Sequence, residues 1–278
     1  MAITEIEPQY AHQAIDAEAL DTDKLRAAAQ KAVRALRAKA LLTSIDHLGE
    51  DVLDREMAAN TVAAYRGLLD ALAAEGLADG IDLSVKLSAV GQALPGDGEK
   101  IALENARSIA AAASHVGATI TLDMEDHTTT DSTLSILRDL RQDFPWVGAV
   151  LQSYLYRTEA DCRDLAYEGS RVRLCKGAYK EPASVAFQAR SDVDRSYVRC
   201  LRILMNGAGY PMIASHDPRL IEITRNLDIT KVVSRSGYDI DSVDNWHTDS
   251  VAILGDAAHS MLWHQGQGAN TAVMDAGG

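Results

Sequence analysis

Polar and ionisable residues recur at or near the carboxyl ends of the predicted strands in the middle of the chain. They are Lys86, then Asp123 with Glu125 and Asp126, then Gln152, then Arg173 with Lys176, and finally His216. Cations of this kind suit an anionic or electron-rich ligand, because they bind a carboxylate and stabilise developing negative charge. The sequence therefore predicts a ligand site to which several strands contribute.

The segment RVRLCKGAYKEP, residues 171–182, raises the question of why a strand carries cations. Its apolar residues predict a buried strand, yet Arg171, Arg173 and Lys176 interrupt them. We interpret these cations as lying outside the core proper and facing the ligand. The alternative for any single strand is a cation that reaches the sheet edge or pairs with an aspartate. Only the repetition over several strands favours a ligand.

Strand-like and helix-like segments alternate from residue 81 to residue 227 and must position these side chains. The expected strands are 81–90, 118–126, 147–155, 170–179 and 210–218, and the helices that follow them are 99–117, 129–144, 158–168, 192–208 and 219–227. Two earlier helices are expected at 23–42 and 55–75. This alternation predicts an α/β fold with a parallel sheet, open or closed into a barrel. In a barrel, the carboxyl ends of the strands meet at the mouth, where active sites lie.

Composition excludes several classes of function. The formal net charge of −13 disfavours nucleic acid as a partner, because phosphate contacts require a basic surface. The chain has no run of eighteen apolar residues and its acidic N-terminus lacks the features of a secretory signal. We therefore expect a cytoplasmic protein, and a peripheral contact with the inner face of the cell membrane stays open. Cys162, Cys175 and Cys200 have no C-x-x-C spacing, so we expect neither a disulfide framework nor a metal site.

The chain between about residue 40 and residue 225 resembles the bacterial proline dehydrogenases, the flavoenzymes of proline catabolism. The segments that carry the resemblance are SVKLSAVGQALPGDGEKIALENA, TLDMEDHTTTDSTLSILRDLR, AVLQSYLYRTEADCRDL, RVRLCKGAYKEP and MIASHDPR. The resemblance implies a distorted (β/α)8 barrel that holds FAD non-covalently. It also implies that L-proline is oxidised to Δ1-pyrroline-5-carboxylate by hydride transfer to flavin N5, and that a membrane quinone receives the electrons.

The resemblance assigns catalytic roles by motif position. Lys86 matches the lysine that helps to hold the proline carboxylate, and Asp123 matches the acidic residue that organises the cations around the substrate. Tyr179 matches an aromatic wall of the proline pocket. The structural alternative for Tyr179 is ordinary core packing.

The resemblance assigns FAD contacts to Gln152, Arg173, Lys176, Gly177, Ala178 and His216. Gln152 and Arg173 match contacts to the flavin ring, with Arg173 near N5, and the others match residues beside the cofactor. We expect the backbone of Gly177 to approach the cofactor closely because glycine has no Cβ. The alternatives are a strand-end cap for Gln152 and a buried, hydrogen-bonded histidine for His216.

The resemblance stops after residue 225. The family continues with further strands and a last helix that carries an R-R-x-x-E motif, and Arg225 and Arg235 lack that spacing. We therefore expect a barrel that is incomplete or irregularly closed at its C-terminus, and an impaired enzyme. The alternative is a catalytically inactive flavin-binding or vestigial fragment of such an enzyme.

Residues 246–278 resemble a different family, the FAD-dependent aromatic hydroxylases. In that family the G-D-A-A-H segment holds the FAD ribityl chain through its aspartate, here Asp256. The G-x-G-x-x-G loop of that family is absent, so this segment alone should not bind FAD. The expected organisation is a helical or mobile segment at 1–40, a barrel at 41–227 and an atypical C-terminal segment at 228–278.

Overall fold

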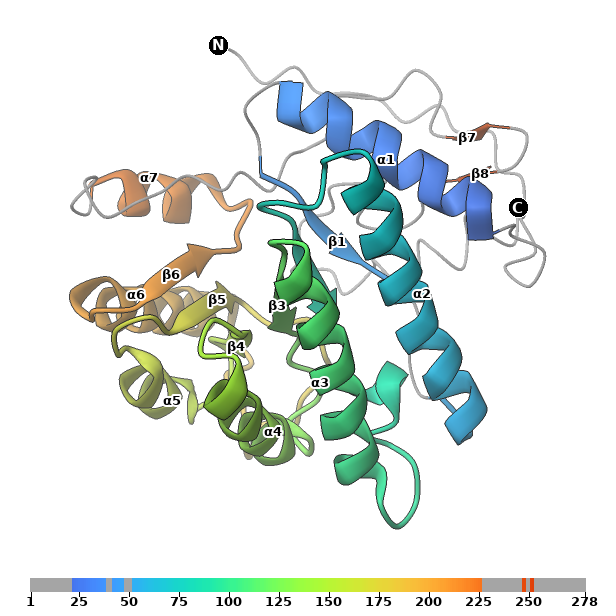
Figure 1. Ribbon diagram of the computed structural model, residues 1–278. Coiled ribbons are helices and arrows are strands. Elements are labelled where there is room, and N and C mark those ends of the chain that lie inside the picture. The colour runs from blue at the N-terminus through green and yellow to red at the C-terminus, as the bar shows by residue number, and fades with distance from the viewer. Residues whose placement is uncertain (1–21, 39–41, 48–51, 227–246, 249–250, 253–278) are drawn as a thin grey trace. The chain divides into compact units, whose positions relative to one another are not determined.

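The computed structural model describes residues 22–38, 42–47, 52–226, 247–248 and 251–252 (Figure 1). The chain divides into two compact units, one of residues 29–237 and one of residues 1–28 with 238–278. The larger unit contains the sheet that carries the predicted site. Most of the segments predicted at 1–40 and 228–278, including Asp256, lie outside the described residues.

Six parallel strands form one sheet in the larger unit. They are β1 (Ser44–Asp46), β2 (Asp82–Val85), β3 (Thr119–Leu122), β4 (Gly148–Gln152), β5 (Arg171–Cys175) and β6 (Tyr210–Ile213). Strands that follow one another along the chain are neighbours in the sheet, from β1 at one edge to β6 at the other. This order, with a helix between every two successive strands of the sheet, is that of a β/α barrel wall.

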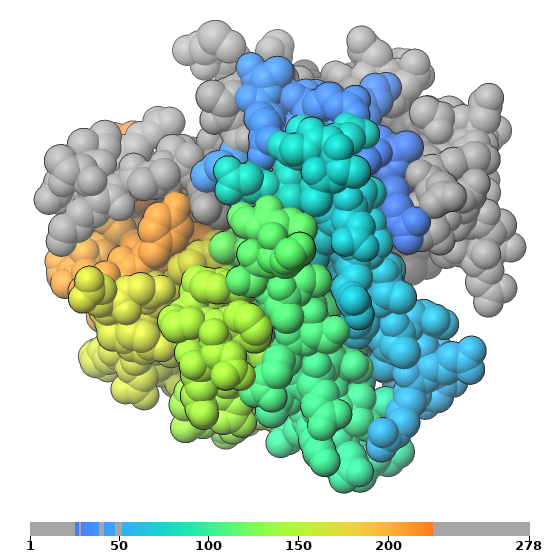
Figure 2. Space-filling view, viewed as in Figure 1, coloured from blue at the N-terminus to red at the C-terminus, as the bar shows by residue number. Residues whose placement is uncertain are grey.

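The helices pack outside the sheet. They are α1 (Thr22–Ala38), α2 (Arg55–Ala74), α3 (Gly98–His115), α4 (Thr130–Asp143), α5 (Thr158–Leu165), α6 (Arg190–Asn206) and α7 (Pro218–Asn226), with a short 3₁₀ helix, η2, at Ser88–Val90. Figure 2 shows the outer surfaces of α2 and α3 side by side on one face of the molecule. None of the helices in the described ranges is long and apolar enough to cross a membrane.

In β2, β3 and β5, apolar and polar side chains alternate, and this alternation separates the two faces of these strands. Leu83 and Val85 in β2, like Ile120 and Leu122 in β3, are fully buried. On the other face, the hydroxyls of Thr119 and Thr121 in β3 donate to Asp82 in β2. The apolar face of these strands therefore forms the core with the helices, and their concave face carries polar contacts.

The sheet is strongly curved. Side chains of β5 reach Asp82 in β2, although two strands stand between them in the sheet. A flat sheet would separate these strands by roughly 14 Å. The α/β prediction is confirmed as a half-barrel of six parallel strands, with which an incomplete barrel is consistent, and a closed eight-stranded barrel is not seen in the described residues.

The predicted boundaries of the first strands are wrong in two respects. The predicted strand 81–90 ends at Val85, and its last residues form η2. β1 was not predicted, so the first predicted strand is the second in the sheet. Lys86 and Lys176 follow β2 and β5 rather than lying within them, and His216 lies three residues after β6 ends at Ile213.

Candidate functional site

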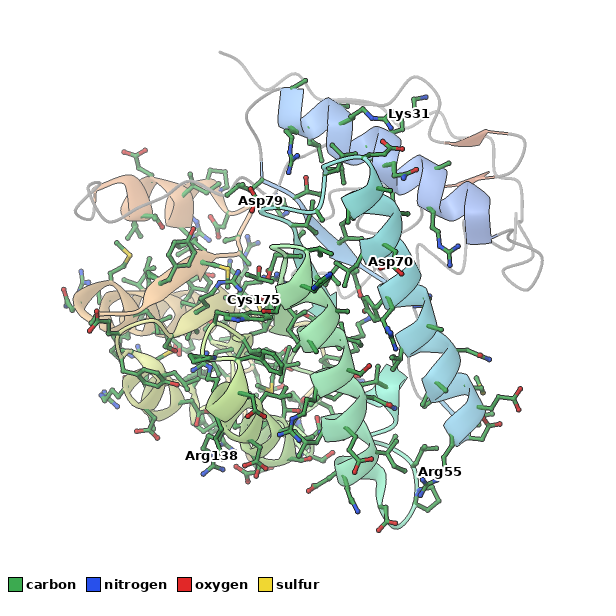
Figure 3. The ribbon with its side chains drawn as sticks, in the orientation of Figure 1. Lys31, Arg55, Asp70, Asp79, Arg138 and Cys175 are labelled. Carbon is green, nitrogen blue, oxygen red and sulfur yellow. The ribbon has the colours of Figure 1, made fainter. Side chains whose placement is uncertain are left out.

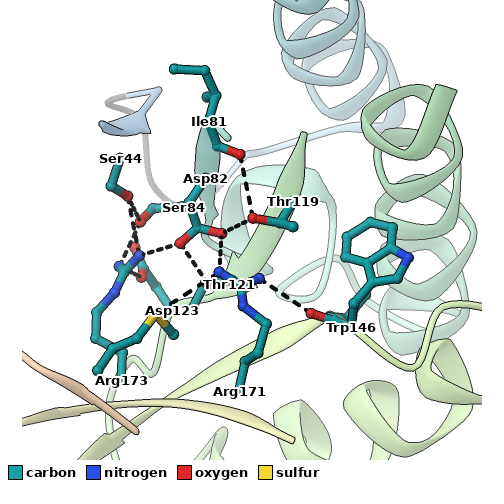
Figure 4. Close-up of polar contacts among 12 residues, drawn as sticks. Ser44, Ile81, Asp82, Ser84, Thr119, Thr121, Asp123, Trp146, Arg171 and Arg173 are labelled. Carbon is teal, nitrogen blue, oxygen red and sulfur yellow. Dashed lines mark hydrogen bonds and ion pairs between the residues drawn. The ribbon is translucent and has the colours of Figure 1, made fainter. Parts of the chain in front are cut away.

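A buried carboxylate, Asp82, is the centre of the concave face (Figure 4). Its side chain is 2% exposed and accepts hydrogen bonds from the hydroxyls of Thr119 and Thr121, both at 2.8 Å. From β5, Arg171 donates to it at 3.1 Å and Arg173 at 2.8 Å. Asp82 is therefore the shared counter-ion of both strand arginines.

The environment of Asp82 favours its charged form. Burial raises the pKa of this carboxyl, but Arg171, Arg173 and the two threonine hydroxyls outweigh burial, and the pKa ends below its ordinary value. This finding corrects the interpretation that the strand cations lie outside the core. Arg171 is 8% exposed and is paired inside the half-barrel.

Arg173 connects this buried pair to the mouth of the half-barrel. Its guanidinium donates to the hydroxyls of Ser84 at 2.7 Å and Ser44 at 3.1 Å. It also lies 3.5 Å from a carboxylate oxygen of Asp123, which directly follows β3. The side chain of Arg173 retains 19% of its exposure. One arginine thus joins the fixed charge of Asp82 to the site predicted at the strand ends.

Asp123 and Lys86 lie close together because their strands are in register. Val85 pairs with Leu122, so Lys86 and Asp123 are the next residues on neighbouring strands. The Lys86 ammonium also lies 3.9 Å from a carboxylate oxygen of Asp46. Two cations, Lys86 and Arg173, therefore lie near two carboxylates, those of Asp46 and Asp123, at this end of the sheet.

The pKa of Asp123 is raised to about 7. Burial is the largest cause, and the negative charges of Asp46 and Glu125 add to the rise, while Arg173 and Lys86 oppose it. Asp123 is therefore a carboxyl group that can hold or release a proton near neutral pH.

Gln152 is buried at the end of β4 and is 2% exposed. Its side-chain amide donates to the backbone carbonyl of Glu125 at 2.7 Å. The Glu125 carboxylate in turn accepts from the amide and the hydroxyl of Ser88. These contacts tie together the ends of β2, β3 and β4, as the strand-end alternative for Gln152 requires.

Lys176 is held by two carboxylates. Its ammonium donates to Asp194 at 2.7 Å and to Asp217 at 2.9 Å, and the side chain is 11% exposed. Arg219 donates to the same two carboxylates. Hydrogen bonds from Arg219 are the largest cause of a pKa of Asp217 far below its ordinary value, and Lys176 adds to it. Lys176 therefore joins the ends of β5 and β6.

Gly177 has a structural reason to be glycine. Its φ is +118°, and a Cβ at this position would lie 2.4 Å from ring carbons of Tyr154. Close approach to a tyrosine is thus one reason for glycine at this position, and close approach to a cofactor stays a prediction. Of the remaining predicted residues, Ala178 is exposed, and Tyr179 and His216 are half-buried.

Sequence reasoning missed Asp82 and its two threonine partners, Thr119 and Thr121. A signal was available, because polar residues stand two apart on three of the strands. They are Asp82 and Ser84, Thr119 and Thr121, and Arg171 and Arg173. Such spacing puts both members of each pair on the same face of their strand. It would have predicted a polar concave face as well as a polar mouth.

The donor set at the mouth fits a flavin. Arg173 and Lys86 provide positive charge beside a titratable carboxyl, and a cation of this kind stabilises the negative charge that a flavin ring gains on reduction. Other cations, such as Arg55 and Arg138, are exposed on the outer sides of the helices (Figure 3). Cys175, the last residue of β5, is buried. Within the described ranges, no group of three His, Cys, Asp or Glu side chains could hold a metal ion.

A hollow of about 480 Å³ lies at the opposite ends of the strands. Asp79, which precedes β2, and Val116, which precedes β3, are among the residues that line it, together with the last turns of α2 and α3. Since none of the predicted site residues lines this hollow, it is separate from the candidate site.

Comparison with known proteins gives two family matches along the chain. A model of the family described as proline dehydrogenase matches residues 29–238. A model described as FAD binding domain matches residues 223–277. The first match extends at both ends beyond the resemblance at residues 40–225, and the second covers the segment that resembles the aromatic hydroxylases.

Curated relatives and solved structures agree with the first match. Proline dehydrogenase of Deinococcus radiodurans is 36% identical over 211 residues, which are 75% of this chain and 67% of the relative. Proline dehydrogenase 2 of Bacillus subtilis is 35% identical over 195 residues, which are 70% of this chain and 63% of the relative. The chain thus spans about two thirds of the length of these relatives.

In fold, the chain is similar to proline utilization A from Bdellovibrio bacteriovorus inactivated by N-propargylglycine. The TM-score is 0.63 at 22% sequence identity, over 70% of this chain and 25% of that one. A second match, proline utilization A of Bradyrhizobium japonicum, has a TM-score of 0.55 over 63% of this chain and 21% of that one.

Proposed function

The chain belongs to the proline dehydrogenase family, and we propose that it oxidises L-proline to Δ1-pyrroline-5-carboxylate with FAD as cofactor and a quinone as electron acceptor. The observation that most supports this proposal is the cluster of Arg173, Asp123 and Lys86 at the carboxyl ends of β5, β3 and β2. The cluster combines cations for an anionic substrate with a carboxyl group that titrates near neutral pH.

Lys86 binds the carboxylate of proline in this proposal. Its side chain is 17% exposed, and its ammonium lies 3.9 Å from a carboxylate oxygen of Asp46. The exposed part of this side chain is where a substrate carboxylate would approach the ammonium. Tyr179, on the loop after β5, forms an apolar wall for the proline ring.

Asp123 moves the proton. The ring nitrogen of proline must lose its extra proton before the adjacent carbon can give up a hydride. A carboxyl group with a pKa of about 7 is a suitable acceptor for that proton near neutral pH. Its 3.5 Å separation from Arg173 also keeps the guanidinium oriented at the mouth.

FAD, when bound, supplies the acceptor for the hydride that leaves the proline ring. Arg173 is the residue of this chain that would stabilise the resulting negative charge, because it is a permanent cation held in place by Asp82 and two serine hydroxyls. Gln152, Lys176, Gly177, Ala178 and His216 are proposed to lie beside the cofactor.

The substrate site is proposed to be incomplete. The R-R-x-x-E motif is absent from the sequence, and the sheet in the described residues has six strands. Two missing charge-assisted hydrogen bonds would cost about 3–6 kcal/mol, which weakens proline binding by roughly 10²- to 10⁴-fold. This weakness favours a second candidate, a protein that binds flavin and turns over little or no proline.

The visible absorbance spectrum of the purified protein tests the proposal. A flavin band that bleaches when L-proline is added without oxygen, and returns when a soluble quinone follows, is the expected result. A band that does not bleach, even at high proline concentration, would support the second candidate. A purified protein without flavin, which gains none when FAD is added, would contradict both.

A matched pair of variants assigns the chemistry to the cluster. Arg173→Met should abolish bleaching by proline, because it removes the cation beside Asp123. Arg195→Met removes an equally charged group whose side chain is 66% exposed on α6, and it should bleach like the unmodified protein. Equal bleaching in both variants would separate Arg173 from the reaction.

A further inference from the structure

One buried carboxylate, Glu181, joins three loops at the mouth of the half-barrel. It is 7% exposed and lies on the loop after β5. One of its oxygens accepts from the backbone amide of His127 at 2.8 Å, and the other contacts His127 Nδ1. The hydroxyl of Tyr154 also donates to it, at 3.3 Å. His127 follows β3 and Tyr154 follows β4, so each neighbouring loop contributes a partner.

Tyr154 supports the same loop along its length. Its ring occupies the space that a side chain at Gly177 would need. Its backbone amide donates to the carbonyl of Lys176 at 2.9 Å, and its carbonyl accepts from the amide of Phe187 at 2.8 Å. Burial raises the pKa of Tyr154 far above its ordinary value, with Glu181 adding to the rise, so the hydroxyl keeps its proton and remains a donor.

Hydrogen bonds hold the backbone of Tyr179 at both its amide and its carbonyl. The Tyr154 hydroxyl accepts a hydrogen bond from the backbone amide of Tyr179. The backbone amide of Glu181 donates to the carbonyl of Tyr179 at 3.1 Å. Both backbone groups of Tyr179 are thus tied to the residues that Glu181 organises, while the flanking Ala178 and Lys180 are exposed.

We propose that Glu181 is a positioning residue which, through Tyr154 and His127, fixes Tyr179 at the place where its ring meets the substrate. Glu181 acts through the loop and does not itself contact proline, so its loss should affect substrate binding more than the chemical step. The role of Tyr179 in substrate binding rests on the proposed function, whereas the restraint of the loop does not.

A carboxylate is required at this position for a physical reason. Its partners are a backbone N–H, a tyrosine O–H and an imidazole nitrogen, and a carboxylate can accept from all three. Glutamine has nearly the same size, but its NH₂ group would face at least one of these donors. A buried donor left without a partner costs about 1–3 kcal/mol.

The test compares Glu181→Gln with Lys180→Gln in the full chain. Lys180→Gln changes the neighbouring exposed residue and leaves the contacts of Glu181 with His127 and Tyr154 intact. Two quantities are measured: hydrogen exchange of the backbone amides of residues 177–181, and the KM for proline separately from kcat. In Glu181→Gln we expect exchange to accelerate about tenfold or more and KM to rise about tenfold, with kcat changed by less than about threefold. Lys180→Gln should match the unmodified protein in both.

A second variant, Tyr154→Phe, keeps the ring against Gly177 and removes only the hydroxyl. It should change exchange and KM in the same direction as Glu181→Gln, and it decides the question if Glu181→Gln does not fold. Folded variants whose exchange equals that of Lys180→Gln would overturn the proposal. Faster exchange with an unchanged KM would also overturn it, because the loop would then be restrained without positioning Tyr179.

Failure of the proposed function gives a different pattern. An unmodified protein without turnover would contradict that function, and the exchange of the Tyr179 amide would still test whether Glu181 holds the loop. Tetrahydrofuran-2-carboxylate, which keeps the ring and the carboxylate of proline but has no ring nitrogen, then replaces the KM measurement. It should bind about tenfold more weakly to Glu181→Gln than to Lys180→Gln, and equal binding would overturn the proposal.

Discussion

Two aspartates on the concave face, at the scale of single residues, show how environment divides similar side chains between different roles. Asp82 has two arginine partners, at 2.8 and 3.1 Å, and its pKa lies below the ordinary value. Asp123 is 3.5 Å from its arginine, and burial raises its pKa to about 7. The first is a permanent counter-ion, and the second can exchange a proton near neutral pH.

The raised pKa of Asp123 predicts a specific pH dependence of stability. The folded protein binds the proton of the Asp123 carboxyl more tightly than the unfolded chain does. The stabilisation that this proton provides is therefore fully present below about pH 4. It is lost as the pH rises through about 7, by at most about 4 kcal/mol of unfolding free energy. Asp123→Asn removes this loss.

Urea unfolding at pH 4 and pH 8 measures the effect. The free energy of unfolding should fall less between these two pH values in Asp123→Asn than in the unmodified protein. Asp131→Asn, which changes a side chain that is 86% exposed, serves as the control and should behave like the unmodified protein. Parallel behaviour of Asp123→Asn and Asp131→Asn would show that Asp123 titrates normally.

The site could be predicted only in part from single residues. Lys86, Asp123 and Arg173 could be found because each stands out against an apolar strand, and the structure brings them together. For Asp82, the spacing from Ser84 marks a polar face, but the pairing with Arg171, 89 residues later, cannot be read from any local pattern. Glu181 escaped because a charged residue in a loop is ordinarily solvated.

At the scale of elements, the alternation of strands and helices was predictable and the first strand was not. The β2 to β6 strands have enough apolar residues to be seen as runs. β1 is Ser44–Asp46, with one apolar residue between two polar ones, and three residues are too few to show a period of two. Its pairing with β2 is what defines it as a strand.

The loop after β5 gives a prediction at this scale. Gly177→Ala must place a Cβ where the Tyr154 ring lies, at 2.4 Å, and must also keep a φ of +118°. Gly169→Ala meets only the second difficulty, with a φ of +79° and no atom within 4 Å. We expect Gly177→Ala to lower the free energy of unfolding by at least about 1–3 kcal/mol more than Gly169→Ala does. Equal losses in urea unfolding would mean that the ring moves aside at little cost.

At the scale of the whole molecule, the family match and the larger compact unit have nearly the same limits. The match covers residues 29–238 and the unit covers residues 29–237. The second match, to an FAD binding domain at residues 223–277, falls mostly on the other unit. This division indicates that the half-barrel holds the determinants of its own fold.

A shortened chain tests this inference. Residues 22–237 should unfold in one cooperative transition, at a urea concentration close to that of the first transition of the full chain, because they contain the whole parallel sheet and α1. Circular dichroism during urea unfolding measures it. A gradual loss of signal without a transition would show that residues 1–21 or 238–278 are needed for the fold.

The pairing of Asp82 with Arg171 also has a consequence for the chain during its synthesis. Since 89 residues separate the two, a ribosome that adds about 5–20 residues per second needs roughly 4–18 s to make the arginine after the aspartate. During that interval β2 carries a carboxylate whose charged partners do not yet exist. The concave face can therefore assemble only after β5 is made, and the nascent half-barrel must wait for its fifth strand before its interior is neutralised.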